Sequence, residues 1–184
     1  MNWEIIEENA GLAKIKVIGV GGAGGNAVIH MINHEIQGAD FICANTDSQA
    51  LDRATGSTIL KLGDNVTRGL GAGADPKVGR AAAERDRAAI EELLAGADMI
   101  FITAGMGGGT GTGAAPTIAR LASEKQILTV GIVTIPFSFE GEKRKTSALA
   151  GVDRLRDYTD TLLVIPNDKL LDASTHNTSF LEAF

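Results

Sequence analysis

The sequence has little cysteine, no long apolar run and no metal-binding cluster, and each shortage excludes a class of protein. A single cysteine, Cys43, cannot form an internal disulfide, so the chain is not a disulfide-stapled secreted domain and suits a reducing cytoplasm. The acidic first eight residues contain no apolar segment, so we expect no signal peptide. No apolar run approaches the roughly 20 residues of a membrane-spanning helix, so we expect no direct insertion into a membrane. The three histidines are scattered along the sequence, so we expect no metal site from them.

The chain also lacks an excess of positive charge. It carries 17 Lys and Arg against 23 Asp and Glu, which gives a formal net charge of -6 at pH 7. Binding to duplex nucleic acid needs a basic face, so we expect no nucleic-acid partner. A single nucleotide is not excluded, because backbone N–H groups can hold phosphates without much positive charge.

What the chain has in excess is glycine, with 23 residues gathered at the ends of predicted strands. Strands are expected at residues 14–20, 41–44, 58–62, 98–103, 127–135 and 161–165, and helices at 26–34, 76–94, from 114 through 120, and 145–158. The strands lack strict alternation, so both faces of their sheet should be covered. The pattern predicts an α/β fold: a doubly wound, Rossmann-like parallel sheet of about six strands with helices on both faces. We expect an N-terminal extension over residues 1–13 and one nucleotide-binding domain over residues 14–184.

The first glycine cluster follows the first predicted strand. Gly19, Gly21 and Gly24 spell G-x-G-x-x-G, and Asp47 ends the next strand, as in a dinucleotide-binding fingerprint. Glycine lets the backbone approach a phosphate, and the following helix offers free N–H groups. Two interpretations remain open: an NAD-binding oxidoreductase domain, or a tight turn without a ligand.

The second cluster, Gly-Gly-Gly-Thr-Gly-Thr-Gly at residues 107–113, precedes another predicted helix. Such a loop can wrap a di- or triphosphate, with Thr110 and Thr112 donating to phosphate oxygens. Two facing loops suit a longer phosphate chain than a dinucleotide has, and neither loop is a Walker A motif. We expect a bulky residue at Gly109 to abolish nucleotide binding while leaving the fold largely intact.

Residues 107–113 resemble the signature of the tubulin superfamily. The flanking segments are similar to the FtsZ family rather than to eukaryotic tubulin, and the resemblance extends from about Lys14 onward. These segments are Asn45-Thr46-Asp47, residues 69–74, Phe139-Glu140-Gly141 with Arg144, and residues 165–170.

The resemblance implies a polymerising tubulin-like GTPase of the bacterial division ring, with GTP or GDP and Mg²⁺ as ligands. Asn45 and Asp47 would lie near the phosphates and Mg²⁺, although the metal ligands themselves are not identified. The implied phosphate-binding residues are Gly21, Gly22, Ala23, Gly24, Gly25, Asn26, Gly108, Gly109, Thr110, Gly111 and Thr112, with Ala72, Gly73 and Ala74 near the γ-phosphate.

The resemblance also implies a guanosine-binding end of the site. Glu140 and Arg144 would hold the ribose and the edge of the base, Asn26 and Asn167 would read guanine, and Phe184 would pack near it. Without the resemblance, Glu140 and Arg144 read as an exposed ion pair, Asn167 as a turn residue and Phe184 as core.

In the family, a long central helix, a catalytic loop and a second domain should follow, and that loop acts on the nucleotide of a neighbouring subunit. We therefore expect no catalytic residue in this chain and no appreciable GTP hydrolysis by it alone. The expected partners are further copies, head to tail in filaments when the protein is full length, and division-ring proteins through regions absent here. The expected location is a mid-cell ring in the cytoplasm. Competing functions are an NAD-dependent oxidoreductase and a nucleotide-free module that caps a partner.

Overall fold

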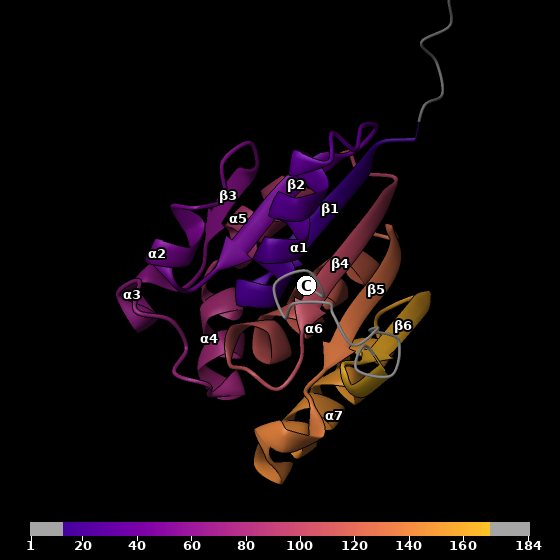
Figure 1. The fold of residues 1–184 in the computed structure, drawn as a ribbon. Coiled ribbons are helices and arrows are strands. Elements are labelled where there is room, and N and C mark those ends of the chain that lie inside the picture. Colours follow the sequence, from indigo (N-terminus) through magenta and orange to yellow (C-terminus); the bar gives the residue numbers. More distant parts are fainter. Residues whose placement is uncertain (1–12, 170–184) are drawn as a thin grey trace, which may run out of the picture.

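A computed structural model describes residues 13–169, which form a parallel sheet of six strands between two layers of helices (Figure 1). The strand order is β3-β2-β1-β4-β5-β6, and every neighbouring pair is parallel. The strands are β1 (Ile15–Val20), β2 (Asp40–Asn45), β3 (Thr58–Lys61), β4 (Met99–Gly105), β5 (Leu128–Ile135) and β6 (Thr161–Pro166). The predicted fold class is confirmed, and all six predicted strands are present.

Successive side chains of the central strand enter two different cores. Val17 packs with Val28 and Cys43 in the smaller cluster, while Ile18 belongs to the larger one. Both faces of β1 are therefore buried, which explains why its sequence shows no apolar-polar alternation. Cys43 is 1% exposed, as expected for a buried structural thiol, and this burial raises its thiol pKa.

The two cores lie under two helical layers. Helices α1 (Gly21–Asn33) and α2 (Ser48–Leu51) contribute to the smaller core. The larger core takes side chains from α4 (Pro76–Arg85), α5 (Arg87–Leu94), α6 (Thr110–Glu124) and α7 (Glu142–Arg156). Two single turns, α3 (Asp64–Thr67) and η1 (Ser138–Glu140), lie in connecting segments.

The helix boundaries differ from the predicted ones in two ways. The helices after the glycine clusters begin at Gly21 and Thr110, several residues early, so the glycines form their first turns. The helix predicted over residues 76–94 is broken at Asp86, whose carboxylate accepts a hydrogen bond from Gly63 N at 2.5 Å. That contact ties the break to the segment before α3. The start was predicted correctly, because Asp75 caps α4 by accepting from Lys77 N at 2.8 Å.

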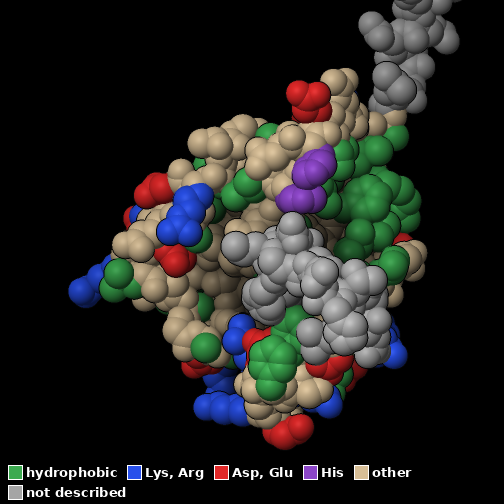
Figure 2. Space-filling view, viewed as in Figure 1, with side chains coloured by type: hydrophobic (Ala, Val, Ile, Leu, Met, Phe, Trp, Pro, Cys, Tyr) green, Lys and Arg blue, Asp and Glu red, His purple; other side chains and the backbone are tan. Residues whose placement is uncertain are grey.

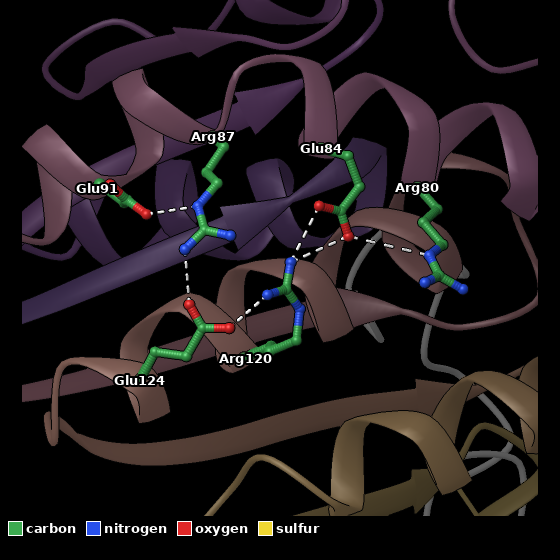
Figure 3. Close-up of polar contacts among 6 residues, drawn as sticks. All are labelled: Arg80, Glu84, Arg87, Glu91, Arg120 and Glu124. Atoms are coloured by element: carbon green, nitrogen blue, oxygen red, sulfur yellow. Dashed lines mark hydrogen bonds and ion pairs between the residues drawn. The ribbon is translucent and has the colours of Figure 1, made fainter.

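An ion-pair network joins α4 and α5 to α6 (Figure 3). Arg87 lies 2.6 Å from Glu91 and 2.8 Å from Glu124, and Arg120 lies 3.0 Å from Glu84. Exposed ion pairs contribute about 0–1 kcal/mol each to stability, so the main effect of the network is to fix how α4 and α5 lie against α6. The backbone fixes the spacing beneath it, since a β-carbon at Gly113 would lie 2.1 Å from Pro76 O. The network anchors the C-terminal half of α6 through Arg120 and Glu124, and the close approach at Gly113 holds the start of the helix, which belongs to the candidate site.

Candidate nucleotide-binding site

The predicted glycine loops meet where the sheet changes direction. From β1 the chain proceeds outward to β2 and β3, and β4 then returns to the other side of β1. The carboxyl ends of β1 and β4 are therefore neighbours, each followed by a helix. Ligands of doubly wound sheets bind in the crevice at this switch point.

Two helix N-termini converge there without side-chain caps. The residues preceding α1 and α6 are Val20 and Gly109, and neither makes a capping hydrogen bond through a side chain. The two termini lie close together, because a β-carbon at Gly21 would be 3.0 Å from Gly111 N. Free N–H groups and two positive dipole ends thus face one region, which suits an anion such as a phosphate chain.

The glycines of the two loops differ in whether they face open space or pack against protein atoms. A β-carbon at Gly22, Gly25 or Gly108 would meet no atom within 4 Å, so these positions border open space. Gly24 and Gly109 instead pack against protein. A β-carbon on Gly24 would lie 2.3 Å from Thr103 O, which lets α1 approach the sheet.

Gly109 is packed against the loop before α4. A β-carbon there would lie 2.7 Å from the Ala72 methyl carbon and 3.0 Å from Asp75 N. The expectation that a bulky residue at Gly109 would leave the fold largely intact is therefore wrong. Ala23 has a packing contact too, since a β-carbon at Gly105 would lie 2.7 Å from its methyl group.

The two threonine hydroxyls that we expected to donate to phosphate have partners within the protein. Thr110 Oγ1 lies 2.7 Å from Thr46 Oγ1 in a buried pair. Thr112 Oγ1 accepts from Gly107 N at 2.8 Å, and its side chain is fully buried. These hydroxyls brace the loop, and the backbone N–H groups of the first helical turn are left to bind an anion.

The segment after β2 and the loop over residues 68–75 lie beside this helix start. Asp47 forms an isolated bridge with Leu70, and Gly71 N donates to Thr46 O at 3.0 Å. Gly73 and Ala74 have φ angles of 57° and 60°, in the left-handed region, and the residues on either side of them, Ala72 and Asp75, face Gly109. The predicted γ-phosphate residues are thus next to the predicted phosphate loop.

The side chains of Asn45 and Asp47 organise their own turn. Asn45 Oδ1 accepts from Thr46 N at 2.8 Å, and Asp47 Oδ1 accepts from Gln49 N at 2.9 Å. Asp47 thereby caps α2. No group of three or more His, Cys, Asp or Glu side chains that could hold a metal ion occurs within residues 13–169.

Three of the predicted base-binding residues, Glu140, Arg144 and Asn167, follow the ends of β5 and β6. Arg144 is 2.8 Å from Glu140, whose other carboxylate oxygen accepts from Phe137 N at 2.9 Å. The ion pair that sequence alone allowed is therefore present, and the Arg144 side chain remains 53% exposed. A β-carbon at Gly107 would lie 2.9 Å from Arg144 Cγ, so this end is continuous with the phosphate loop.

Asn167 holds an unsatisfied buried acceptor. Its backbone N–H donates to Ile135 O at 3.0 Å, and its side-chain oxygen is buried without a hydrogen-bond partner among residues 13–169. An unpaired buried acceptor costs about 1–3 kcal/mol of desolvation free energy, so a hydrogen-bond donor of a bound ligand would remove that penalty. Phe184 lies outside the described residues, as do residues 1–12 of the predicted extension.

A small pocket beside the helix starts adds residues that the motifs did not indicate. Five predicted site residues line it: Gly21, Gly22, Gly25, Asn26 and Asn45. Arg53 and Cys43 line it as well. Neither belongs to a glycine motif: Cys43 comes from β2, which pairs with β1, and Arg53 comes from the turn after α2. Its volume of about 50 Å³ is too small for a nucleotide, which would lie across the open crevice and enter it in part.

The fold and this site define a nucleotide-binding domain of the tubulin type. The family model for the Tubulin/FtsZ family, GTPase domain, matches residues 14–175, and the chain belongs to this family. The described helices include none long and apolar enough to cross a membrane.

Within the family, the chain is similar to bacterial cell-division proteins. It is 57% identical over 182 residues to the cell division protein FtsZ of Coxiella burnetii and equally identical to that of Pseudomonas aeruginosa. These alignments cover 99% of the chain but 47% and 46% of the two relatives. The chain thus spans about half the length of these curated relatives.

Solved structures of the same family have the same fold. An FtsZ dimer from M. jannaschii superposes with a TM-score of 0.88 at 44% identity, over 93% of this chain and 50% of that one. A CetZ protein of Haloferax volcanii, solved as a GTPγS-bound protofilament, gives a TM-score of 0.81 at 25% identity, over 92% of this chain and 53% of that one.

Proposed function

We propose that this chain is the GTP- and GDP-binding part of a polymerising GTPase of bacterial cell division. The observation that carries the proposal is the pair of uncapped helix N-termini at the switch point of the sheet. Two such termini facing one space suit a chain of two or three phosphates. The names of the similar proteins supply the biological setting.

The nucleotide would lie across the carboxyl edge of the sheet. Its phosphates would meet the first turns of α1 and α6, with the terminal phosphate beside residues 72–74. The base would reach Asn167, whose orphaned oxygen can accept from the N–H groups of guanine. Asn26, exposed on α1, would contact the base from the other side. Arg144, held by Glu140, would contact the ribose and the edge of the base.

Magnesium would be held mainly by the phosphates. Asp47 is the carboxylate that the predicted site offers, and one of its oxygens already caps α2. Mg²⁺ commonly keeps several waters and takes one or two carboxylates together with phosphate oxygens, so this donor set fits. The ion would supply charge neutralisation to the phosphates.

Hydrolysis would need a group from another subunit. Attack on the terminal phosphate requires an oriented water and a residue to position it, and we assign that task to no residue of this chain. Two exposed apolar side chains flank the proposed site: Leu70 is 84% exposed and Phe139 is 71% exposed. A further copy docking head to tail on this face would bury them and bring the missing group. Contacts with other division-ring proteins and a mid-cell location belong to the same proposal.

Calorimetry with GDP, GTP, ATP and NAD tests the assignment. We expect guanine nucleotides to bind tighter than ATP or NAD, and Asn167→Ala to weaken GDP binding about tenfold, as loss of one base contact of about 1.4 kcal/mol predicts. Asn33→Ala, an exposed amide at the far end of α1, is the matched control and should bind as the parent does. Equal affinity for ATP would overturn the guanine assignment, and tighter NAD binding would favour the oxidoreductase alternative.

A further inference from the structure

Two histidines stand together at the end of α1 that points away from the phosphate site. His30 and His34 are four residues apart on the helix, and both are exposed. Their ring centroids are 4.1 Å apart, with an angle of 32° between the planes. Figure 2 shows histidine side chains gathered at one place on the molecular surface. Residues four apart share a helix face, so both imidazoles lie on the same side of α1. The expectation that the histidines are too scattered for a metal site therefore does not hold for this pair.

The hydrogen bonding of His34 prepares it to act as a ligand. His34 Nδ1 lies 2.9 Å from His30 O, and since a carbonyl can only accept, Nδ1 carries the proton. In the neutral ring, Nε2 is then left unprotonated and can accept a metal ion. A histidine that donates one ring N–H to a backbone carbonyl and offers the other nitrogen is the arrangement found around bound metal ions.

We propose that His30 and His34 form a two-imidazole site for a divalent transition-metal ion. Imidazole nitrogen favours Cu²⁺, Ni²⁺ and Zn²⁺ over Mg²⁺ and Ca²⁺, which prefer oxygen ligands. Because no group of three metal-binding side chains occurs in the described part of the chain, water completes the coordination. The site is separate from the proposed nucleotide site and does not depend on it.

Metal binding here closes the last turn of α1. His34 is the C-cap residue of the helix, and its backbone N–H bonds to His30 O and Ile32 O. A metal ion bridging the two rings holds that turn in its folded form, so the ion binds the native state better than the unfolded chain. The thermal midpoint then rises with metal concentration, as mass action requires.

The test measures Cu²⁺ and Ni²⁺ binding to the whole chain by calorimetry, together with the shift in thermal midpoint. One equivalent should bind, and His30→Gln and His34→Gln should each weaken binding at least about tenfold, because a chelate becomes a single ligand. Both side chains are exposed, so circular dichroism should show an intact fold.

The third histidine supplies the control. His176→Gln removes an imidazole of the same chain and should leave the affinity and the stoichiometry unchanged. Full-strength binding in either the His30→Gln or the His34→Gln variant would overturn the proposal, as would loss of binding in His176→Gln. A midpoint shift of equal size with Mg²⁺ would also count against an imidazole site.

Discussion

The hydroxyl of Thr46 lies 2.7 Å from the hydroxyl of Thr110, and this buried pair joins the end of β2 to the first residue of α6. Replacing Thr46 with valine keeps the shape but leaves the Thr110 hydroxyl without that partner. We expect Thr46→Val to lower the free energy of unfolding by about 1–3 kcal/mol. Urea denaturation measures the loss, and Thr161→Val, at an exposed position of β6, should change stability by less than about 0.5 kcal/mol.

Adjacent glycines of the second loop should respond differently to the same substitution. Gly108→Ala adds a methyl group where no atom lies within 4 Å, so stability should hold while the group intrudes on the proposed phosphate position. Gly109→Ala pushes against Ala72 and Asp75, and core overpacking of this kind costs about 1–3 kcal/mol. Thermal melts and GDP calorimetry on both variants separate the effects. A stable Gly108→Ala chain with normal GDP affinity would place the phosphates elsewhere.

Ala74 is held at a φ of 60°, in the left-handed region that disfavours residues with a β-carbon. This conformation costs about 1–2 kcal/mol, which glycine removes. Glycine also makes the unfolded chain more flexible, and that entropy lowers stability by about 0.4–1 kcal/mol. We expect Ala74→Gly to leave stability unchanged or raise it by about 1 kcal/mol. The same change at Ala81, exposed within α4, should lower stability by about 1 kcal/mol. Equal losses at both positions in chemical denaturation would contradict the strained turn.

Asp168 links the end of β6 to the segment after β5 through a charge-dependent contact. Its carboxylate accepts from the Ser138 hydroxyl and from Ser138 N at 3.0 Å, and these bonds lower the pKa of Asp168 below its ordinary value. Because the folded pKa is depressed, this stabilisation is fully present above the unfolded pKa of about 3.9 and is lost as pH falls through the lower folded value. Carbon-13 NMR titration should show the Asp168 midpoint below the ordinary value for an aspartate, and Ser138→Ala should raise that midpoint. An unchanged midpoint would rule out the contact.

Motifs and periodicity predicted the strands well but misjudged where the helices begin. The glycines at residues 21–25 and 110–113 look like loop residues by propensity, yet tertiary packing makes them helical first turns. The break at Asp86 depends on a contact with Gly63, a residue distant in sequence, so no local pattern reveals it.

In the candidate site, too, local sequence predicted some features, and others depend on tertiary contacts. Sequence predicted which loops meet, because parallel strands present their carboxyl ends together. It did not reveal that Gly109 and the Thr112 hydroxyl face protein, since a glycine that admits a ligand and one that admits a helix are identical in sequence. Arg53 entered the pocket lining only through the packing of a helix that was not predicted.

The placement of β1 between β2 and β4 also bears on how the chain is made. Lys14 and Asp98, which pair at the start of these two strands, are separated by 84 residues. A ribosome adding about 5–20 residues per second releases β1 and β2 seconds before β4 emerges. Throughout that interval β1 presents one unpaired edge, the kind of edge that recruits other chains. The exposure of that edge ends only when β4 takes its place in the sheet.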